Sequence, residues 1–322
     1  MRDSRVLVTG GLGFMGSDMV RYLVSEDLCG SVSVLDNFSY SADVNRVSLA
    51  GGDVEIHRGD IRDSSIVSRL VRKVDVVLNF AAETHNDNSL ERPLDFVSTN
   101  VDGVATLLDA CREHNVYLHQ ISTDEVFGDL PLDSNKEFDE NSSLRPSSPY
   151  SASKASAELL VLAWVRSFDI RASISNAANN FGEFQHSEKL IPQLMERAFR
   201  GERARLYGRG SNMRDWLYVR DHSRAVWAIV SEQERKTSDR YVISAGQVFS
   251  NLEVSAAVNK GFGLPENYYQ LVEDRPGHDL KYSSSSALLR RDFDWSPIGP
   301  SLQDWIAAES RSLMLKKSLG NV

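Results

Sequence analysis

The sequence predicts an α/β protein built on a doubly wound parallel sheet, and two observations favour this fold class. Strand-like and helix-like segments alternate through the first half of the 322 residues, which is typical of βαβ units. In addition, a glycine-rich turn follows the first strand directly and leads into a helix. Right-handed crossovers between such units place helices on both faces of the sheet.

Six short apolar runs are predicted to be the strands of this sheet. They lie at residues 6–9, 32–35, 54–57, 74–80, 116–122 and 171–175. Runs of this length, bounded by turn residues, fit strands that are buried on both faces. Helical patterns separate them: one ends near residue 23, two cover 64–71 and 95–113, and a fourth runs from Tyr150 to Phe168.

Beyond Asn176 the regular alternation ends. Short segments, scattered aromatic residues and loops at 182–188 and 208–212 predict a smaller, irregular lobe that binds the substrate. We therefore expect a dinucleotide-binding domain over residues 1–175, with a returning segment at about 215–243. The substrate lobe is then formed by residues 176–214 and 244–322.

Composition narrows the class of protein. Hydrophobic residues make up 41% of the chain and charged residues 25%, as in ordinary globular proteins. A net charge of −9 disfavours a nucleic-acid partner. Cys29 and Cys111 stand in unrelated contexts, which predicts reduced thiols rather than a disulfide framework or a metal site. Neither a signal peptide nor an apolar stretch long enough to span a bilayer is recognisable, so we expect a cytoplasmic protein.

The glycine-rich turn predicts a site for NAD. Glycines at 10, 13 and 16 permit a tight turn, close approach of the backbone to a pyrophosphate, and close packing of the helix on the sheet. Asp36 lies 20 residues after Gly16, at the end of the second strand, where it can accept both hydroxyls of the adenosine ribose. The same carboxylate would repel a 2′-phosphate, which favours NAD over NADP. Asp60, after the third strand, is a candidate contact for the adenine, although a Gly-Asp pair is also a common turn.

Four polar residues indicate proton-transfer chemistry. Tyr150 and Lys154 are four residues apart, so they share one helix face, and a nearby ammonium favours the phenolate. Asp124 and Glu125 follow the end of the fifth strand and offer a second acid and base, which simple alcohol oxidation does not require. Oxidation combined with elimination of water is therefore the leading interpretation. For this, the pair must lie in the loop past the strand, and Asp124 must stay protonated through burial and its neighbouring carboxylate.

At this point the chain resembles the extended short-chain dehydrogenases/reductases and, among them, the nucleoside-diphosphate-glucose 4,6-dehydratases, most closely those acting on dTDP-D-glucose. The resemblance covers nearly the whole chain. The motifs that carry it lie at residues 9–16, 81–85, 122–128, 150–154, 179–182, 188–192, 214–216 and 274–279.

The resemblance implies a role for each catalytic residue. Tyr150 takes the proton of the sugar 4-hydroxyl, and Lys154 keeps Tyr150 ionised and holds the nicotinamide ribose. Thr123 hydrogen-bonds the 4-oxygen. Glu125 then removes the C5 proton, which the 4-ketone has made acidic, and Asp124 protonates the departing 6-hydroxyl. Hydride returns to C6, so NAD stays bound and is regenerated in each cycle.

The resemblance also implies the binding residues, and it implies no metal. Cofactor contacts are expected from Gly10, Gly13, Phe14, Met15, Gly16, Asp36, Asn37, Ser39, Asp60, Ile61, Ala81, Ala82, Thr99, Tyr150, Lys154 and Asn180. Contacts to the nucleotide-sugar substrate are expected from Thr84, Thr123, Asn179, Lys189, Leu190, Tyr207, Arg214, Asn251, Arg275 and His278. Among these, three cations (Lys189, Arg214 and Arg275) would surround the diphosphate. His85 is expected to be structural.

Departures from the family pattern leave alternatives open. Asn86-Asp87-Asn88 stands where the dTDP-glucose enzymes usually have Val-Asp-Arg, and an Asn at the last position is typical of UDP-glucose enzymes. Phe127 and Phe181 replace common tyrosines. The 274–279 motif keeps the dTDP-type form, which favours thymidine. UDP-glucose or another NDP-glucose therefore stays an alternative substrate.

Two further alternatives remain, an NDP-sugar epimerase or decarboxylase and a non-enzymatic NAD-sensing protein. The intact acid pair argues against the first, and the presence of both Tyr150 and Lys154 argues against the second. The family further implies a homodimer through a four-helix bundle, here formed by the 95–113 helix and the helix that contains Tyr150.

Overall fold

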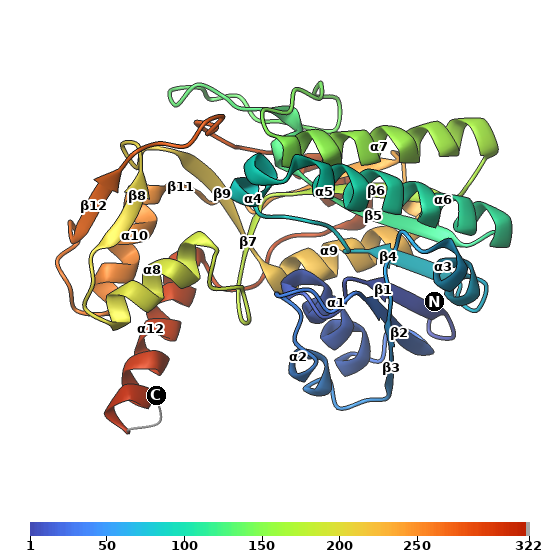
Figure 1. The fold of residues 1–322 in the computed structure, drawn as a ribbon, viewed down its shortest axis with the longest axis horizontal. Helices are drawn as coiled ribbons and strands as arrows, with labels where there is room; N and C mark the ends of the chain where they lie inside the picture. Colours follow the sequence, from blue (N-terminus) through green and yellow to red (C-terminus); the bar gives the residue numbers. More distant parts are fainter. Residues whose placement is uncertain (320–322) are drawn as a thin grey trace.

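Seven parallel strands form the central sheet of the computed structural model, which describes residues 1–319. Their order is β10-β6-β5-β4-β1-β2-β3 (Figure 1). The order reverses between β1 and β4, as in doubly wound dinucleotide-binding sheets, so the predicted fold class is confirmed. The strands are β1 (Arg5–Thr9), β2 (Ser31–Asp36), β3 (Val54–Arg58), β4 (Val76–Asn79), β5 (Tyr117–Thr123), β6 (Ala172–Ala177) and β10 (Arg240–Ile243).

Helices cover both faces of this sheet because alternate strand residues point to opposite sides (Figure 1). One face buries Leu7 against α3 (Ser64–Val71), α6 (Gly103–His114) and α7 (Pro149–Phe168). The opposite face buries the neighbouring Val6 and Val8 against α1 (Phe14–Ser25), α9 (Val219–Ser231) and α11 (Ala287–Phe293). Two apolar layers thus fix the sheet, and its strand ends carry the polar residues discussed below.

Several boundaries differ from the predicted ones. The predicted strand 74–80 shortens to four residues, because Val74 closes a turn on Val71 before β4 begins. The predicted helix 95–113 begins earlier, as α5 (Pro93–Val97), and passes through a π-helical turn at Ser98–Asp102 into α6. The sheet also contains a seventh strand, β10, which pairs with β6. Only four residues long, β10 gives little periodic signal in the sequence.

The smaller lobe is more regular than the sequence predicts. Its core packs Ile191, Val254 and Trp305 from three helices against two small sheets. These sheets are β11-β9-β7 and β12-β8. The elements are β7 (Asn179–Phe181), α8 (Leu190–Phe199), β8 (Ala204–Tyr207), β9 (Met213–Tyr218), β11 (Val248–Ser250), α10 (Asn251–Gly261), β12 (Tyr269–Val272) and α12 (Leu302–Ser318).

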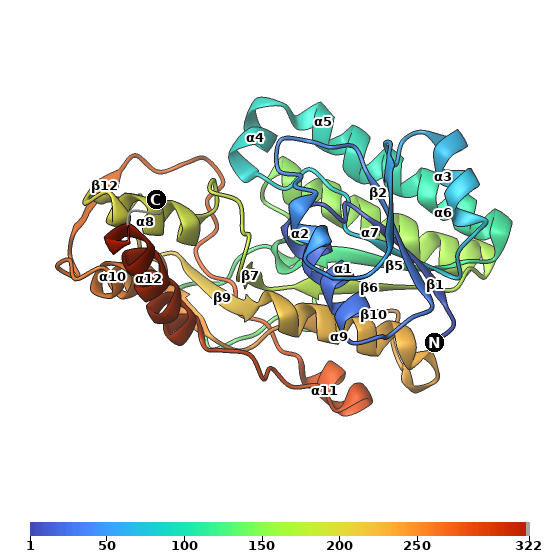
Figure 2. The same ribbon diagram turned by 90° about the horizontal axis from the view of Figure 1, so that it is seen from below.

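Short helical elements complete the list, and β9 connects the lobe to the main part. The remaining helices are α2 (Asn45–Ser48), α4 (Asn86–Glu91), and the 3-10 turns Asp124–Phe127 and Gln233–Arg235. Figure 2 shows that β9 of the lobe runs directly into α9 under the main sheet. The lobe therefore stands beyond the carboxyl ends of the parallel strands, where such sheets bind their ligands.

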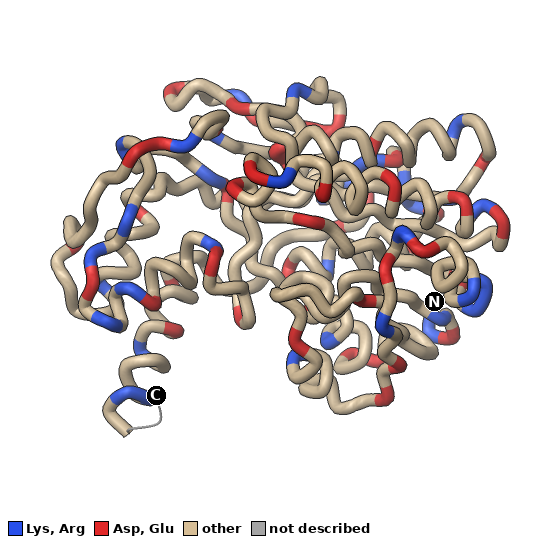
Figure 3. The backbone as a smooth tube through the Cα atoms, in the orientation of Figure 1, with Lys and Arg blue, Asp and Glu red and all other residues tan. Residues whose placement is uncertain are grey.

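Lys and Arg are scattered among Asp and Glu along the backbone in the view of Figure 3. Among residues 1–319, no helix combines the length and the apolarity needed to cross a membrane.

Candidate active site

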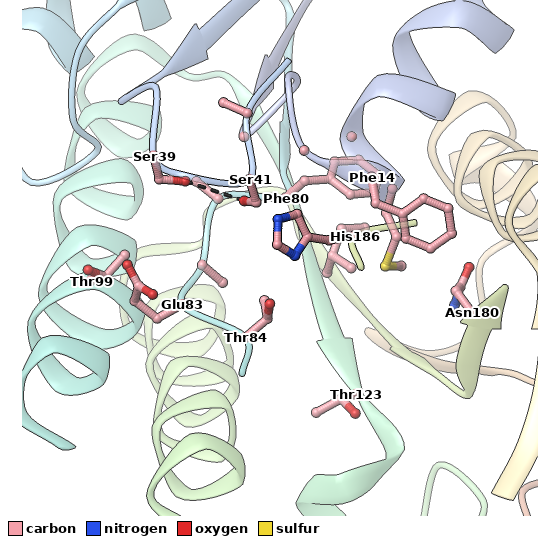
Figure 4. Close-up of a pocket in the computed structure, with 18 of the residues that line it drawn as sticks. Phe14, Ser39, Ser41, Phe80, Glu83, Thr84, Thr99, Thr123, Asn180 and His186 are labelled. Atoms are coloured by element: carbon pink, nitrogen blue, oxygen red, sulfur yellow. Dashed lines mark hydrogen bonds between the residues drawn. The ribbon is translucent and has the colours of Figure 1, made fainter. Parts of the chain in front are cut away.

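A cleft lies at the carboxyl ends of the strands, around the point where the strand order reverses. All the residues predicted to contact the cofactor line this cleft. The predicted substrate contacts Thr84, Thr123, Asn179 and Lys189 line it as well. Figure 4 shows that Phe14 and Asn180 stand on one side of the cleft and Thr99 on the other. The geometry therefore gathers the motifs of β1, β2, β4, β5 and α7 around one cavity.

The glycine loop fits a dinucleotide phosphate. Gly10 adopts a φ of +65°, and a Cβ there would lie 2.7 Å from the Ala81 nitrogen. A Cβ on Gly16 would collide with the carbonyl oxygen of Gly10. No side chain caps α1 at Gly13, so the N–H groups of its first turn remain available to an anion. The turn thus needs glycine both for its backbone conformation and for space.

Asp36 is held at the adenosine end of the cleft by two backbone donors. Its Oδ2 accepts from the N–H of Leu12 at 3.0 Å and its Oδ1 from the N–H of Phe38 at 2.9 Å. Burial raises the pKa of Asp36, while these two bonds oppose the shift. Each carboxylate oxygen keeps a further lone pair, as contacts to two ribose hydroxyls require. Asp60 also lines the cleft, where an ion pair with Arg62 at 2.7 Å lowers its pKa.

Tyr150 and Lys154 lie in the first turns of α7, and both are buried. The Lys154 ammonium donates to the carbonyl oxygen of Ile121 at 2.6 Å, and burial lowers the pKa of Lys154 to about 8. The sequence predicts that Lys154 lowers the pKa of Tyr150. Without a bound cofactor, burial, then Glu125 and Asp124, raise the pKa of Tyr150. The phenolate therefore requires additional positive charge in the cleft.

The acid pair lies past the end of β5, as the sequence predicts, in the 3-10 turn Asp124–Phe127. Thr123 caps this turn, since its Oγ1 accepts from the N–H of Glu125 at 3.2 Å. Glu125 lines the cleft, whereas Asp124 is 1% exposed and lies outside the lining. Burial, then Glu125 and Asp215, raise the pKa of Asp124 well above its usual range. This direction agrees with the expected protonated Asp124.

Only some of the predicted substrate-binding residues line the cleft, and the others lie in the smaller lobe. Leu190 begins α8 beside Lys189, whose ammonium donates to the carbonyl oxygen of Thr84 at 3.1 Å. Asn251 begins α10 in the lobe and is buried. The Arg214 guanidinium donates to the Asp279 carbonyl oxygen at 2.9 Å, so it organises the lobe backbone in addition to its predicted role.

Three other predicted substrate residues, Arg275, Tyr207 and His278, form a cluster in which the first two contact Asp87. Arg275 forms an ion pair with Asp87 at 3.0 Å, and the Tyr207 hydroxyl donates to Asp87 at 3.4 Å. His278 packs its ring edge-on against Tyr207, with centroids 6.2 Å apart, and bonds Asp274 at 2.7 Å. Arg275 is therefore paired with a carboxylate, and a bound diphosphate could take the place of this carboxylate as its anionic partner.

Sequence reasoning missed several polar residues at the cleft. The Asn86 side chain donates to Glu125 Oε2 at 2.9 Å, although the sequence singled out Asn86 only as a departure from the family pattern. Across the cleft mouth, the Tyr40 hydroxyl donates to Glu188 Oε2 at 3.0 Å, and its ring lies edge-on to His186 with centroids 5.3 Å apart. Of these residues, only Glu188 could have been suspected from the sequence, because it stands beside the predicted substrate contact Lys189. His85 caps α4, in agreement with its expected structural role.

Comparisons with known proteins converge on one group. The family described as GDP-mannose 4,6 dehydratase matches residues 7–298. A dTDP-glucose 4,6-dehydratase of Mycolicibacterium smegmatis is 43% identical over 293 residues, covering 91% of this chain and 88% of the relative. The low-salt glycan biosynthesis protein Agl12 of Haloferax volcanii is also 43% identical, over 91% of this chain and 93% of its own.

The fold is also similar to that of a solved structure. It is the crystal structure of DesIV, a dTDP-glucose 4,6-dehydratase from Streptomyces venezuelae with NAD and TYD bound. The TM-score is 0.90, with 33% sequence identity and 98% of each chain covered.

Proposed function

The chain belongs to the family described as GDP-mannose 4,6 dehydratase, and we propose that it is an NAD-dependent dTDP-glucose 4,6-dehydratase. It converts dTDP-glucose to dTDP-4-keto-6-deoxyglucose and water. The observation that carries this proposal is the acid pair: Asp124, buried and with a raised pKa, beside Glu125 in the lining of a cleft shared with Tyr150. Related enzymes that only transfer hydride need no second acid and base.

The residues divide the reaction among them. NAD, held by the glycine loop and Asp36, would supply the acceptor for the C4 hydride that C6 later receives, and a positive ring charge that would favour the Tyr150 phenolate. Tyr150 takes the proton of the 4-hydroxyl, which Thr123 holds in line, and Lys154 supports the nicotinamide ribose. Glu125 then takes the C5 proton. The freed electron pair forms the C5–C6 double bond, and the C6–O bond breaks as Asp124 protonates the departing oxygen to water. After hydride reaches C6, Glu125 returns its proton to C5, which completes the 4-keto-6-deoxy product.

The binding assignments extend this proposal. The cleft-lining residues from Gly10 to Asn180 hold the dinucleotide, and the fit of the glycine loop supports this. Lys189, Arg214 and Arg275 hold the diphosphate, while Tyr207, Asn251 and His278 surround the nucleoside. The domain assignment also stands as a proposal. It is supported by the way α9 and β10, within the returning segment 215–243, pack into the main sheet.

Turnover with a panel of nucleotide sugars tests the function. The protein with NAD should convert dTDP-glucose to a 4-keto-6-deoxy sugar, identified by mass and NMR, with UDP-, CDP- and GDP-glucose as competitors. Asn88 favours UDP-glucose as the second candidate substrate. A higher kcat/KM for UDP-glucose than for dTDP-glucose would therefore show that the nucleotide base of the substrate is uracil. Absence of a 4-keto-6-deoxy product from every sugar would reject the dehydratase proposal. Deuterium placed at C4 should appear at C6 of the product.

We also propose a homodimer formed through a four-helix bundle by the α5–α6 helix and α7. Exposed apolar side chains on these helices support it, including Leu94 at 78% and Leu159 at 57% exposed. Leu159→Glu should turn the dimer into a monomer in light scattering. Ile298→Glu, at a 71% exposed apolar residue outside these helices, is the matched control and should leave the mass unchanged. A monomeric unaltered protein would contradict the proposal.

The cytoplasm is the compartment we propose for this activity. Cys29 and Cys111 are both free, which suits a reducing compartment.

A further inference from the structure

The side chain of Glu125 is held by a chain of hydrogen bonds that the function does not yet explain. Asn86 Nδ2 donates to Glu125 Oε2 at 2.9 Å, and Ser148 Oγ donates to Asn86 Oδ1 at 3.0 Å. The three residues come from separate elements: Asn86 begins α4, Ser148 caps α7, and Glu125 lies in the turn after β5. The helix that carries Tyr150 is thereby connected to the carboxylate of the base.

The orientation of the Asn86 amide is fixed by Glu125. A carboxylate oxygen only accepts, so the Asn86 NH₂ group faces Glu125 Oε2 and the Asn86 oxygen faces Ser148. Ser148 Oγ accepts from the N–H of Ser151 at 3.1 Å, and its own hydrogen can reach Asn86 Oδ1 or Ser151 Oγ, each 3.0 Å away. Within residues 1–319, no comparable bond holds the second oxygen of Glu125, Oε1, which is left for the substrate.

We propose that Asn86 is a positioning residue for the elimination step. By holding Oε2, it fixes the rotamer in which Oε1 of Glu125 meets the C5 proton. A free glutamate side chain rotates about three bonds, and a small displacement of a base slows proton removal strongly. The inference rests on the proposed dehydratase function, and it adds a residue at which this chain departs from the family pattern.

The test separates the elimination step from the oxidation step. Asn86→Leu keeps the side-chain volume and removes the donor. We expect kcat to fall by about tenfold to a hundredfold, with KM nearly unchanged. Because C5 deprotonation becomes slower than oxidation, the isotope effect of C5-deuterated substrate should rise, and absorbance at 340 nm should build up during turnover. A loss of folding alone produces neither signature.

Two companion variants make the result decisive. Asn86→Gln retains a carboxamide on a longer side chain and should recover part of kcat. If Asn86→Leu unfolds at the assay temperature, the same measurements are made on Asn86→Gln. Asn141→Leu, at an exposed loop asparagine, should match the unaltered protein in all readouts. An unchanged isotope effect in a folded Asn86→Leu protein would overturn the inference. Failure of the unaltered protein to turn over any nucleotide sugar would instead overturn the proposed function.

Discussion

At the scale of single residues, the site depends on a difference between two neighbouring acids. Asp124 is 1% exposed, and within the described part of the chain one of its carboxylate oxygens, Oδ2, has no hydrogen-bond partner. A buried oxygen without a donor is costly as a carboxylate, so burial favours the protonated form. Glu125 faces the cleft and is held by Asn86. The 3-10 turn makes this difference possible, because it turns two adjacent side chains to different surroundings.

Glu125→Gln should stop elimination while leaving oxidation in place. The amide cannot take the C5 proton, but the 4-ketone forms before that proton leaves. Mixed with one equivalent of dTDP-glucose, the variant should show a lasting rise at 340 nm and almost no 4-keto-6-deoxy product. A product yield equal to that of the unaltered protein would reject the role of Glu125.

Asp36→Ala should weaken the retention of NAD. It removes the acceptor of the two ribose hydroxyls, and it frees the N–H groups of Leu12 and Phe38 that now shape the loop. With one to two charged hydrogen bonds lost, we expect the Kd for NAD to rise by roughly tenfold to a hundredfold. Calorimetric titration checks this, with Asp133→Ala in an exposed loop as the control. Full NAD occupancy after purification of the variant would contradict the assignment.

At the scale of elements, the turn from β1 into α1 is specified by space as well as by conformation. Gly10 and Gly51 both have positive φ, +65° and +74°, but only Gly10 is crowded. An added Cβ would meet the backbone of Ala81 at Gly10 and open space at Gly51.

Gly51→Ala should therefore cost only backbone strain, about 1 kcal/mol of the free energy of unfolding. Gly10→Ala adds steric overlap, and we expect a total of about 3 kcal/mol together with impaired NAD binding. Urea denaturation of both variants measures the difference. Equal losses would show that the space around Gly10 is irrelevant.

The sequence predicts those elements that have strong local patterns. The run 64–71 matches α3 at both ends, because Asp63 caps it and the apolar residues repeat at the helical period. By contrast, β10 has four residues and owes its position to pairing with β6. The lobe helices α8, α10 and α12 pack mainly on one another. The amphipathic pattern of α8 is about as strong as that of α3, so this helix could have been predicted. The patterns of α10 and α12 are weak, and the positions of these two helices depend on the assembled lobe.

The candidate site follows the same division. Residues at strand ends, such as Asp36 and Thr123, could be placed at the cleft because parallel strands end at one edge of the sheet. The backbone contact of Arg214 with Asp279 and the bond of Asn86 to Glu125 could not. Both depend on how segments 65 and 39 residues apart meet in the fold.

At the scale of the whole molecule, two buried histidines make stability depend on pH. His119 in β5 and His222 in α9 are both 0% exposed. Burial lowers the pKa of His119 to about 3 and that of His222 to about 4. His119 bonds Ser173 and Ser175, whereas neither ring nitrogen of His222 has a hydrogen-bond partner among residues 1–319.

Stability should therefore fall as pH decreases below about 6.5, the ordinary histidine pKa of the unfolded chain. Below this pH, His119 and His222 bind protons in the unfolded chain but stay neutral in the folded chain. Between pH 7 and pH 5, each histidine then removes about 2 kcal/mol from the free energy of unfolding.

His222→Leu should reduce this loss by about 2 kcal/mol, while the pH dependence between 7.5 and 9 stays the same. Urea denaturation at each pH measures it. Carboxyl groups titrate in both proteins, so the difference between the two isolates the histidine. An identical loss from pH 7 to pH 5 in variant and unaltered protein would exclude this contribution of His222.

The bond between Tyr40 and Glu188 ties the loop after β2 to the loop before α8. Because Glu188 lines the cleft, we expect this bond to slow the exchange of a bound dinucleotide. Since each catalytic cycle restores its own oxidant, slow exchange costs the enzyme nothing. Flux through this step should therefore be insensitive to the respiratory state of the cell, unlike that of dehydrogenases that must draw a fresh coenzyme for every turnover.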